Sequence, residues 1–257
     1  MAVKKYLLFS IMLLVPFIVS AETDDMELVA ENVKYYRTIT VLNNSEVMRN
    51  SNLGEVTSFT TEVTEEEYNS VDVDSYNNSN NSRGLTTETI ETTYKKLHTT
   101  MYTHYTLYRY KATLDWKLIP STRSYDIIGI GHYATVKISG EVDFLQSYCR
   151  GNSVGDCYEG ATYYSTSGRY GSGAMFKIPS GTLTSLQQVI EFDVDKNITG
   201  NITSQLAVGD YSHATSSINI FDAENFSVDC SGIILDDAIE DHYDTIPSSD
   251  AYWTGTW

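Results

Sequence analysis

The sequence predicts an all-β fold, an antiparallel β-sandwich of Greek-key or jelly-roll type, on three observations. Apolar and polar residues alternate with a period of two through the middle of the chain, as in strands that bury one face. These segments are rich in Thr, Tyr, Val and Ile, which strands favour. Gly, Asn, Ser and Pro separate them at short intervals, as between the strands of a sandwich.

Residues 1–21 have the composition of a signal peptide. Lys4 and Lys5 precede an apolar stretch over residues 6–19, and Val19-Ser20-Ala21 supplies a small-residue cleavage site. We therefore expect a secreted protein, extracellular or associated with a cell surface, whose mature chain starts near Glu22. No later stretch approaches the roughly 18 apolar residues that a membrane helix needs, so no transmembrane anchor is expected.

The mature chain divides by composition into two parts. Residues 22–84 are acidic and rich in Asn and Ser, and the run at 76–82 has too few apolar side chains to pack. We expect this region to be partly loop, with perhaps two strands of its own. Residues 85–257 are expected to form the β-sandwich domain.

Residues 97–118 predict either two strands or one bent strand. The even positions from Tyr108 to Leu118 are apolar and the odd ones polar, whereas upstream Leu97 and Met101 place the apolar side chains on odd positions. Unbroken, this stretch would span about 70 Å, much longer than a usual strand. The change of register near Leu107 therefore indicates a bulge or bend.

The rest of the domain predicts several short strands and one helix. Strands are expected at 125–130, 136–148, 174–178, 189–194, 216–221 and 226–228. A short C-terminal helix is expected over 233–243, because five apolar residues share one helical face there: Ile234, Leu235, Ala238, Ile239 and Tyr243.

Charge is distributed unevenly along the chain, which has a formal net charge of -17. Such a charge makes nucleic acid a poor partner. Residues 83–137 hold eight basic against four acidic side chains, whereas no Lys or Arg follows Asn197. These regions could face different partners, although solvated surface is the simpler explanation.

The three cysteines predict one disulfide. Cys149 and Cys157 bracket a loop of hairpin length, and in an oxidising compartment they would pair. Cys230 would then be unpaired and is expected to be buried, with a bond from Cys230 to either of the others as the alternative.

Tyrosine is the prominent aromatic residue, and it suits exposed binding faces because a large ring carries a polar tip. The strongest binding residues on this criterion are Tyr105, Tyr108 and Tyr110. Trp253 and Trp257 could either clamp the C-terminus onto the core or stack on a sugar.

No cofactor is required by the sequence, and calcium is the one ion that its acids could hold. Asp237, Asp241 and Asp244 would share one side of the expected helix, where a cation would relieve their repulsion. No calcium-binding loop pattern surrounds them.

No motif of strong chemical specificity occurs, so the function follows from export and surface chemistry. The leading hypothesis is a secreted, non-catalytic interaction protein that binds a carbohydrate, an envelope component or a protein partner. A secreted hydrolase with paired carboxylates on a β-sandwich is one alternative, since such pairs leave no spacing pattern. A membrane-active β protein that uses residues 86–106 is another, although Lys95, Lys96 and His98 interrupt the apolar face. The sequence leaves the oligomeric state open.

Overall fold

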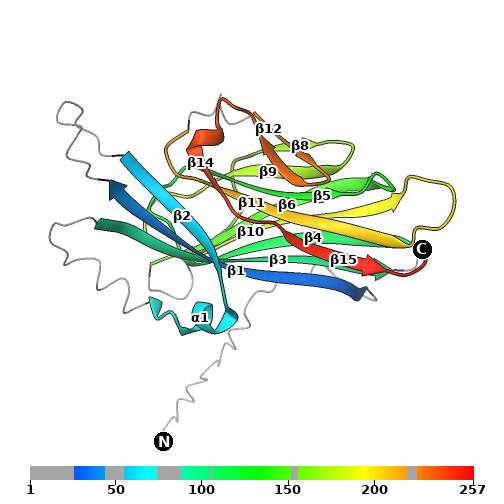
Figure 1. Ribbon diagram of the computed structural model, residues 1–257, viewed down its shortest axis with the longest axis horizontal. Coiled ribbons are helices and arrows are strands. Elements are labelled where there is room, and N and C mark those ends of the chain that lie inside the picture. Colours follow the sequence, from blue (N-terminus) through cyan, green and yellow to red (C-terminus); the bar gives the residue numbers. More distant parts are fainter. Residues whose placement is uncertain (1–25, 44–54, 74–87, 105, 152–155, 219–224) are drawn as a thin grey trace, which may run out of the picture.

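A computed structural model describes residues 26–43, 55–73, 88–104, 106–151, 156–218 and 225–257, and shows the predicted all-β fold with antiparallel sheets. Figure 1 shows two layers of strands running roughly along the long axis of the molecule. The predicted signal peptide lies outside the described residues.

The larger layer is a seven-stranded sheet in the order β2-β1-β3-β4-β10-β6-β7. Several of its strands are unusually long, which spreads the sheet over the whole molecule. In sheet order the strands are β2 (Glu55–Val63), β1 (Glu27–Asn43), β3 (Glu88–His104), β4 (Leu107–Leu118), β10 (Leu183–Lys196), β6 (Val136–Arg150) and β7 (Cys157–Glu159).

The second layer is a six-stranded sheet in which β14 and β15 pair with different parts of β11. Its strands are β14 (Tyr243–Thr245), β15 (Ser249–Thr254), β11 (Ser204–Ala214), β5 (Tyr125–His132), β9 (Gly171–Lys177) and β8 (Tyr163–Ser167). A hairpin of β12 (Phe226–Asp229) and β13 (Gly232–Leu235) forms a separate small sheet.

The change of register near Leu107 separates two strands rather than bending one. β3 ends at His104, β4 begins at Leu107, and the two pair antiparallel with His104 opposite Leu107. Burial along β4 alternates strictly, with every even residue from Tyr108 to Leu118 buried, as the sequence predicts. The buried face of β4 supplies a large part of the core between the layers, including Tyr110, Leu114 and Trp116.

The N-terminal acidic region contributes β1 and β2 to one edge of the larger sheet. β1 is also joined to the C-terminal strand: the Ser249 hydroxyl donates to the carbonyl of Asn32 over 2.8 Å, and the Asn32 amide donates to the carbonyl of Asp250 over 3.0 Å. A six-residue helix, α1 (Glu65–Ser70), follows β2. The Thr64 side chain caps it by accepting from the backbone N–H of Glu67, and the spacing of Thr64 and Glu67 is that of a helix N-cap.

The predicted helix over 233–243 is wrong. Ile233, Ile234 and Leu235 belong to β13, and the rest forms one 3₁₀ turn, η1 (Glu240–His242), followed by β14. The reason is tertiary, because β12 offers these residues a partner strand. The strand expected at 216–221 is likewise absent over the described residues 216–218.

The hairpin of β12 and β13 lies on a block of four glycines in the second sheet. Gly129 pairs with Gly173 across β5 and β9, and Gly131 pairs with Gly171. The side chain of Val228 fills the space above Gly129, Gly171 and Gly173, and a Cβ added at Gly171 would lie 2.6 Å from Val228 Cγ1. The backbone of Asp229 lies above Gly131. The bare backbone therefore lets the hairpin approach closely.

Candidate functional site

The structure places the tyrosines and tryptophans singled out above mostly in the interior. Tyr108 and Tyr110 are 4% and 0% exposed, and Tyr105 lies outside the described residues. The rings of Trp253 and Trp257 lie 5.4 and 4.5 Å from that of Tyr108. These contacts hold the C-terminus on the core, so Tyr108 and Tyr110 offer no surface to a solute.

The three aspartates named for calcium are not gathered into a metal site. Asp237 and Asp241 are exposed near η1, whereas Asp244 is half-buried and contacts residues of the larger sheet. Within the described ranges, no group of three or more His, Cys, Asp or Glu side chains is arranged to hold a metal ion.

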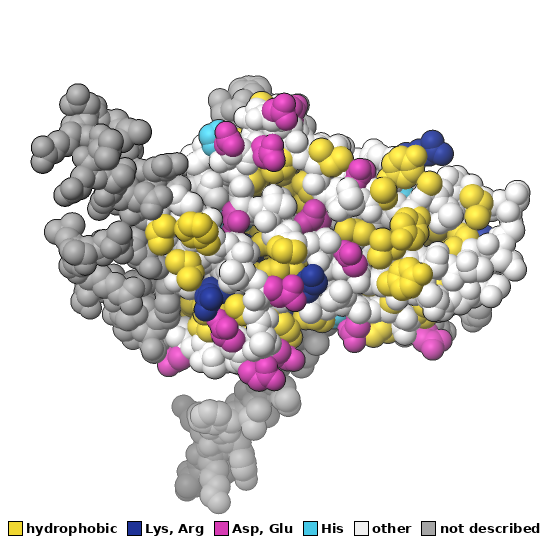
Figure 2. Space-filling view, viewed as in Figure 1, with side chains coloured by type: hydrophobic (Ala, Val, Ile, Leu, Met, Phe, Trp, Pro, Cys, Tyr) yellow, Lys and Arg dark blue, Asp and Glu magenta, His cyan; other side chains and the backbone are white. Residues whose placement is uncertain are grey.

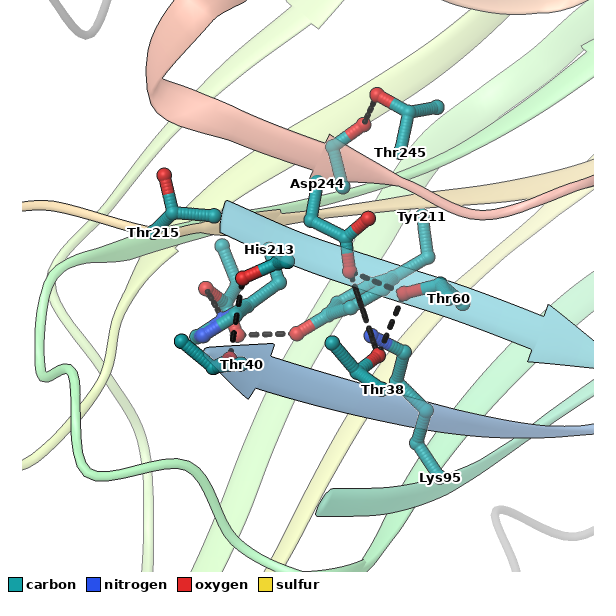
Figure 3. A network of polar contacts seen from close by, with 12 residues as sticks. Thr38, Thr40, Thr60, Lys95, Tyr211, His213, Thr215, Asp244 and Thr245 are labelled. Atoms are coloured by element: carbon teal, nitrogen blue, oxygen red, sulfur yellow. Dashed lines mark hydrogen bonds and ion pairs between the residues drawn. The ribbon is translucent and has the colours of Figure 1, made fainter. Parts of the chain in front are cut away.

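Asp244 instead belongs to a polar network that joins the two layers (Figure 3). Its carboxylate accepts from the hydroxyls of Thr60 and Thr38, the latter over 3.3 Å. The ammonium of Lys95 donates to Thr38 over 3.2 Å and lies 3.8 Å from Asp244. Lys95 Nζ also lies 4.8 Å from the ring centre of Trp116.

A second carboxylate lies in the same interior region. Asp126 is fully buried and accepts from the Tyr211 hydroxyl, from the backbone N–H of Ala214 over 3.2 Å, and contacts His213 Nδ1 at 2.8 Å. Burial lowers the pKa of Lys95, while Asp244 and Asp126 oppose that shift. Because Lys95 has no exposed surface, no solute reaches its amine while the layers are packed together.

A cavity open to solvent lies between the layers, on the side of β6 and β9. Its volume is about 360 Å³, within the range of small-molecule sites. Buried Gln146 and Ile178 belong to its wall, and the Gln146 amide is already engaged, donating to the carbonyl of Lys177 over 3.1 Å and accepting from Gln188 over 2.8 Å. Hydrogen bonds thus fix the Gln146 side chain in the wall before any ligand enters.

Three cations line this cavity: Arg123 from the turn before β5, Arg150 at the end of β6 and Lys177 at the end of β9. Within the described part of the chain, none of them forms an ion pair with a carboxylate. The Nη1 atom of Arg123 is buried and has no hydrogen-bond partner among those residues. Burial lowers the pKa of the Arg123 guanidinium, and Glu91 and Asp126 oppose this from beyond ion-pair distance.

Tyrosine rings flank the cations. Tyr148 of β6 and Tyr158 of β7 stack with ring centres 5.4 Å apart, and the guanidinium of Arg150 lies 5.2 and 5.7 Å from them. The predicted disulfide between Cys149 and Cys157 is confirmed and joins the same two strands beside these rings. Cys230 is free, as expected, but it is exposed at the hairpin turn, so the expectation of burial was wrong.

Sequence reasoning missed this cavity because its residues come from separate elements. Arg123 belongs to the segment 83–137, which has an excess of basic side chains, and Arg150 follows the predicted disulfide partner Cys149. Neither feature indicates that Lys177 lies nearby. No local pattern could have brought the three together.

Comparisons with known proteins leave the family open. No protein-family model matches the chain, and no curated protein matches its sequence. The described residues also contain no helix of the length and apolar character required to span a membrane.

Proposed function

We propose that the protein is a secreted, non-catalytic binding protein that holds a saccharide unit in the cavity lined by Arg123, Gln146, Tyr148, Arg150 and Lys177. The observation that carries the proposal is the open cavity itself, where the stacked Tyr148 and Tyr158 rings adjoin strong hydrogen-bond donors. Sugar rings present C–H faces that pack on aromatic rings and hydroxyls that bond to polar side chains. A saccharide can therefore contact both the tyrosine rings and the hydrogen-bond donors of this cavity.

Two further features support this function. The disulfide fits the oxidising environment that export would provide. The residues that line the cavity include no Asp, Glu, His or Cys. Hydrolysis by a carboxylate pair would need two carboxylates flanking the ligand, so binding fits this cavity better than that chemistry.

The experiment is a glycan panel followed by isothermal titration of the purified protein. Replacing Tyr148 with Ala should weaken binding about tenfold, because it removes a ring of the cavity wall. Tyr252→Ala is the matched control: Tyr252 is 55% exposed on β15 and does not line the cavity. Equal losses in both variants, or no binding to any glycan by the unmodified protein, would contradict the proposal.

A further inference from the structure

The charge of the cavity differs from that of the molecule around it. The chain carries a formal net charge of -17, yet the charged side chains that line this cavity are all cationic. On the face shown in Figure 2, by contrast, Asp and Glu are far more prominent than Lys and Arg. In an acidic protein, three cations that line one cavity and have no carboxylate partner among the described residues form a local site for a negative group.

Arg123 gives that site a specific donor. Arg123 lines the cavity and is only half-buried, so its guanidinium can donate a charge-assisted hydrogen bond to a carboxylate or sulfate oxygen of the ligand. The Nη1 atom of Arg123 is turned away from water and is not the contact with the ligand. Arg150 and Lys177 are exposed at the same cavity and would contribute charge nearer to solvent.

We propose that the ligand is an acidic saccharide, held through a carboxylate or sulfate group by Arg123 together with Arg150 and Lys177. This inference rests on the proposed function and adds the charge of the ligand to it. The ring stack of Tyr148 and Tyr158 favours a sugar over inorganic phosphate, which has no apolar face.

The same charges limit the length of the ligand. Beyond about 8 Å a charge is largely screened at physiological salt, so the cations act mainly on a group inside the cavity. A long polyanion would extend beyond the cavity over a protein with a formal net charge of -17 and be repelled there. The structure therefore favours a short chain with one or a few acidic groups.

The test compares ligands that differ only in charge. Titration of the purified protein with a galacturonate trimer and with its methyl ester should show about 30-fold tighter binding of the acid, the usual worth of one good charge-assisted hydrogen bond. A sulfated disaccharide in a further arm distinguishes a sulfate from a carboxylate as the recognised group. Raising the salt concentration should weaken binding of the acid and leave binding of the ester unchanged.

Variants assign the preference to the cavity. Arg123→Gln should abolish the preference for the acid, and Arg150→Gln should reduce it. Arg169→Gln is the matched control for Arg150, because Arg169 is also an exposed arginine over a tyrosine ring, 5.3 Å from that of Tyr170, but does not line the cavity. Thermal midpoints measured in parallel report whether each variant is folded.

The outcomes separate the two proposals. Equal affinity for acid and ester would overturn the acidic class and leave saccharide binding intact. An acid preference that survives Arg123→Gln in a folded protein would overturn the assignment of that preference to Arg123. Binding of inorganic phosphate or an acidic peptide, with no saccharide bound, would overturn both proposals. If no saccharide binds, neutral or acidic, the proposed function itself is wrong.

Discussion

Lys95 and the cations of the cavity, all among the described residues, differ in how their charge is balanced. At Lys95 the ammonium is fully buried and has a carboxylate, a hydroxyl and two aromatic rings around it. At the cavity, Arg150 and Lys177 are exposed and no described carboxylate pairs with them. The first arrangement connects strands of both sheets, whereas the second leaves charge available to a solute.

This difference separates stability from binding in terms that experiments can measure. Removing one member of a buried, compensated pair leaves an uncompensated charge in the interior, which destabilises the fold strongly. Removing an exposed cation that has no carboxylate partner leaves no uncompensated charge in the interior. Substitutions in the two regions should therefore affect different properties.

The largest effect is expected from Asp244→Ala. It leaves the buried ammonium of Lys95 without its carboxylate and should lower the free energy of unfolding by about 3 to 5 kcal/mol. Urea denaturation measures the change. The double variant Lys95→Met with Asp244→Leu is the control, since it removes both charges and should recover most of the loss. A small loss in the single variant would show that the network does not hold the layers together.

A smaller, pH-dependent effect is expected at Asp210, a buried acid that forms no ion pair with any described residue. Burial raises its pKa to about 6, although its carboxylate accepts from the backbone N–H groups of Tyr211 and Ile233. The folded state then binds the proton more tightly than the unfolded state, so this group favours folding at low pH. Its contribution falls by roughly 2 kcal/mol as the pH rises from 4 to 7.

The Asp210 effect can be measured by comparison with Asp210→Asn. The free energy of unfolding is measured for both proteins between pH 4 and 7. As the pH rises, the unmodified protein should lose stability relative to the variant. A constant difference over that range would mean that Asp210 titrates alike in the folded and unfolded states.

The smallest effect on stability is expected from Lys177→Gln. Lys177 is exposed and has no carboxylate partner among the described residues, and its Nζ atom lies 5.8 Å from the ring centre of Tyr125, so the free energy of unfolding should change by less than about 0.5 kcal/mol. The same substitution should weaken binding of an acidic saccharide. A loss of stability comparable to that of Asp244→Ala would show that the two regions do not differ as described.

The features of this fold that depend on residues close together in the sequence could be predicted. The alternation along β4 and the pairing of Cys149 with Cys157 are local patterns, and both are confirmed. The helix expected at 233–243 failed because its apolar face is equally suited to a strand that packs on another surface. The cavity could not be predicted because Arg123, Arg150 and Lys177 meet only when the two sheets pack together.

The glycine block beneath β12 and β13 has a consequence for how the fold is assembled. β5 and β9 present almost no side chains of their own at this block, so the apolar layer there must come from Phe226, Val228 and Ile233. The hairpin can form locally, but its site exists only after β5 and β9 have paired. Docking of the hairpin is therefore expected to be a late step of folding, and a side chain introduced at Gly173 would slow that step while leaving the pairing of β4 with β10 unaffected.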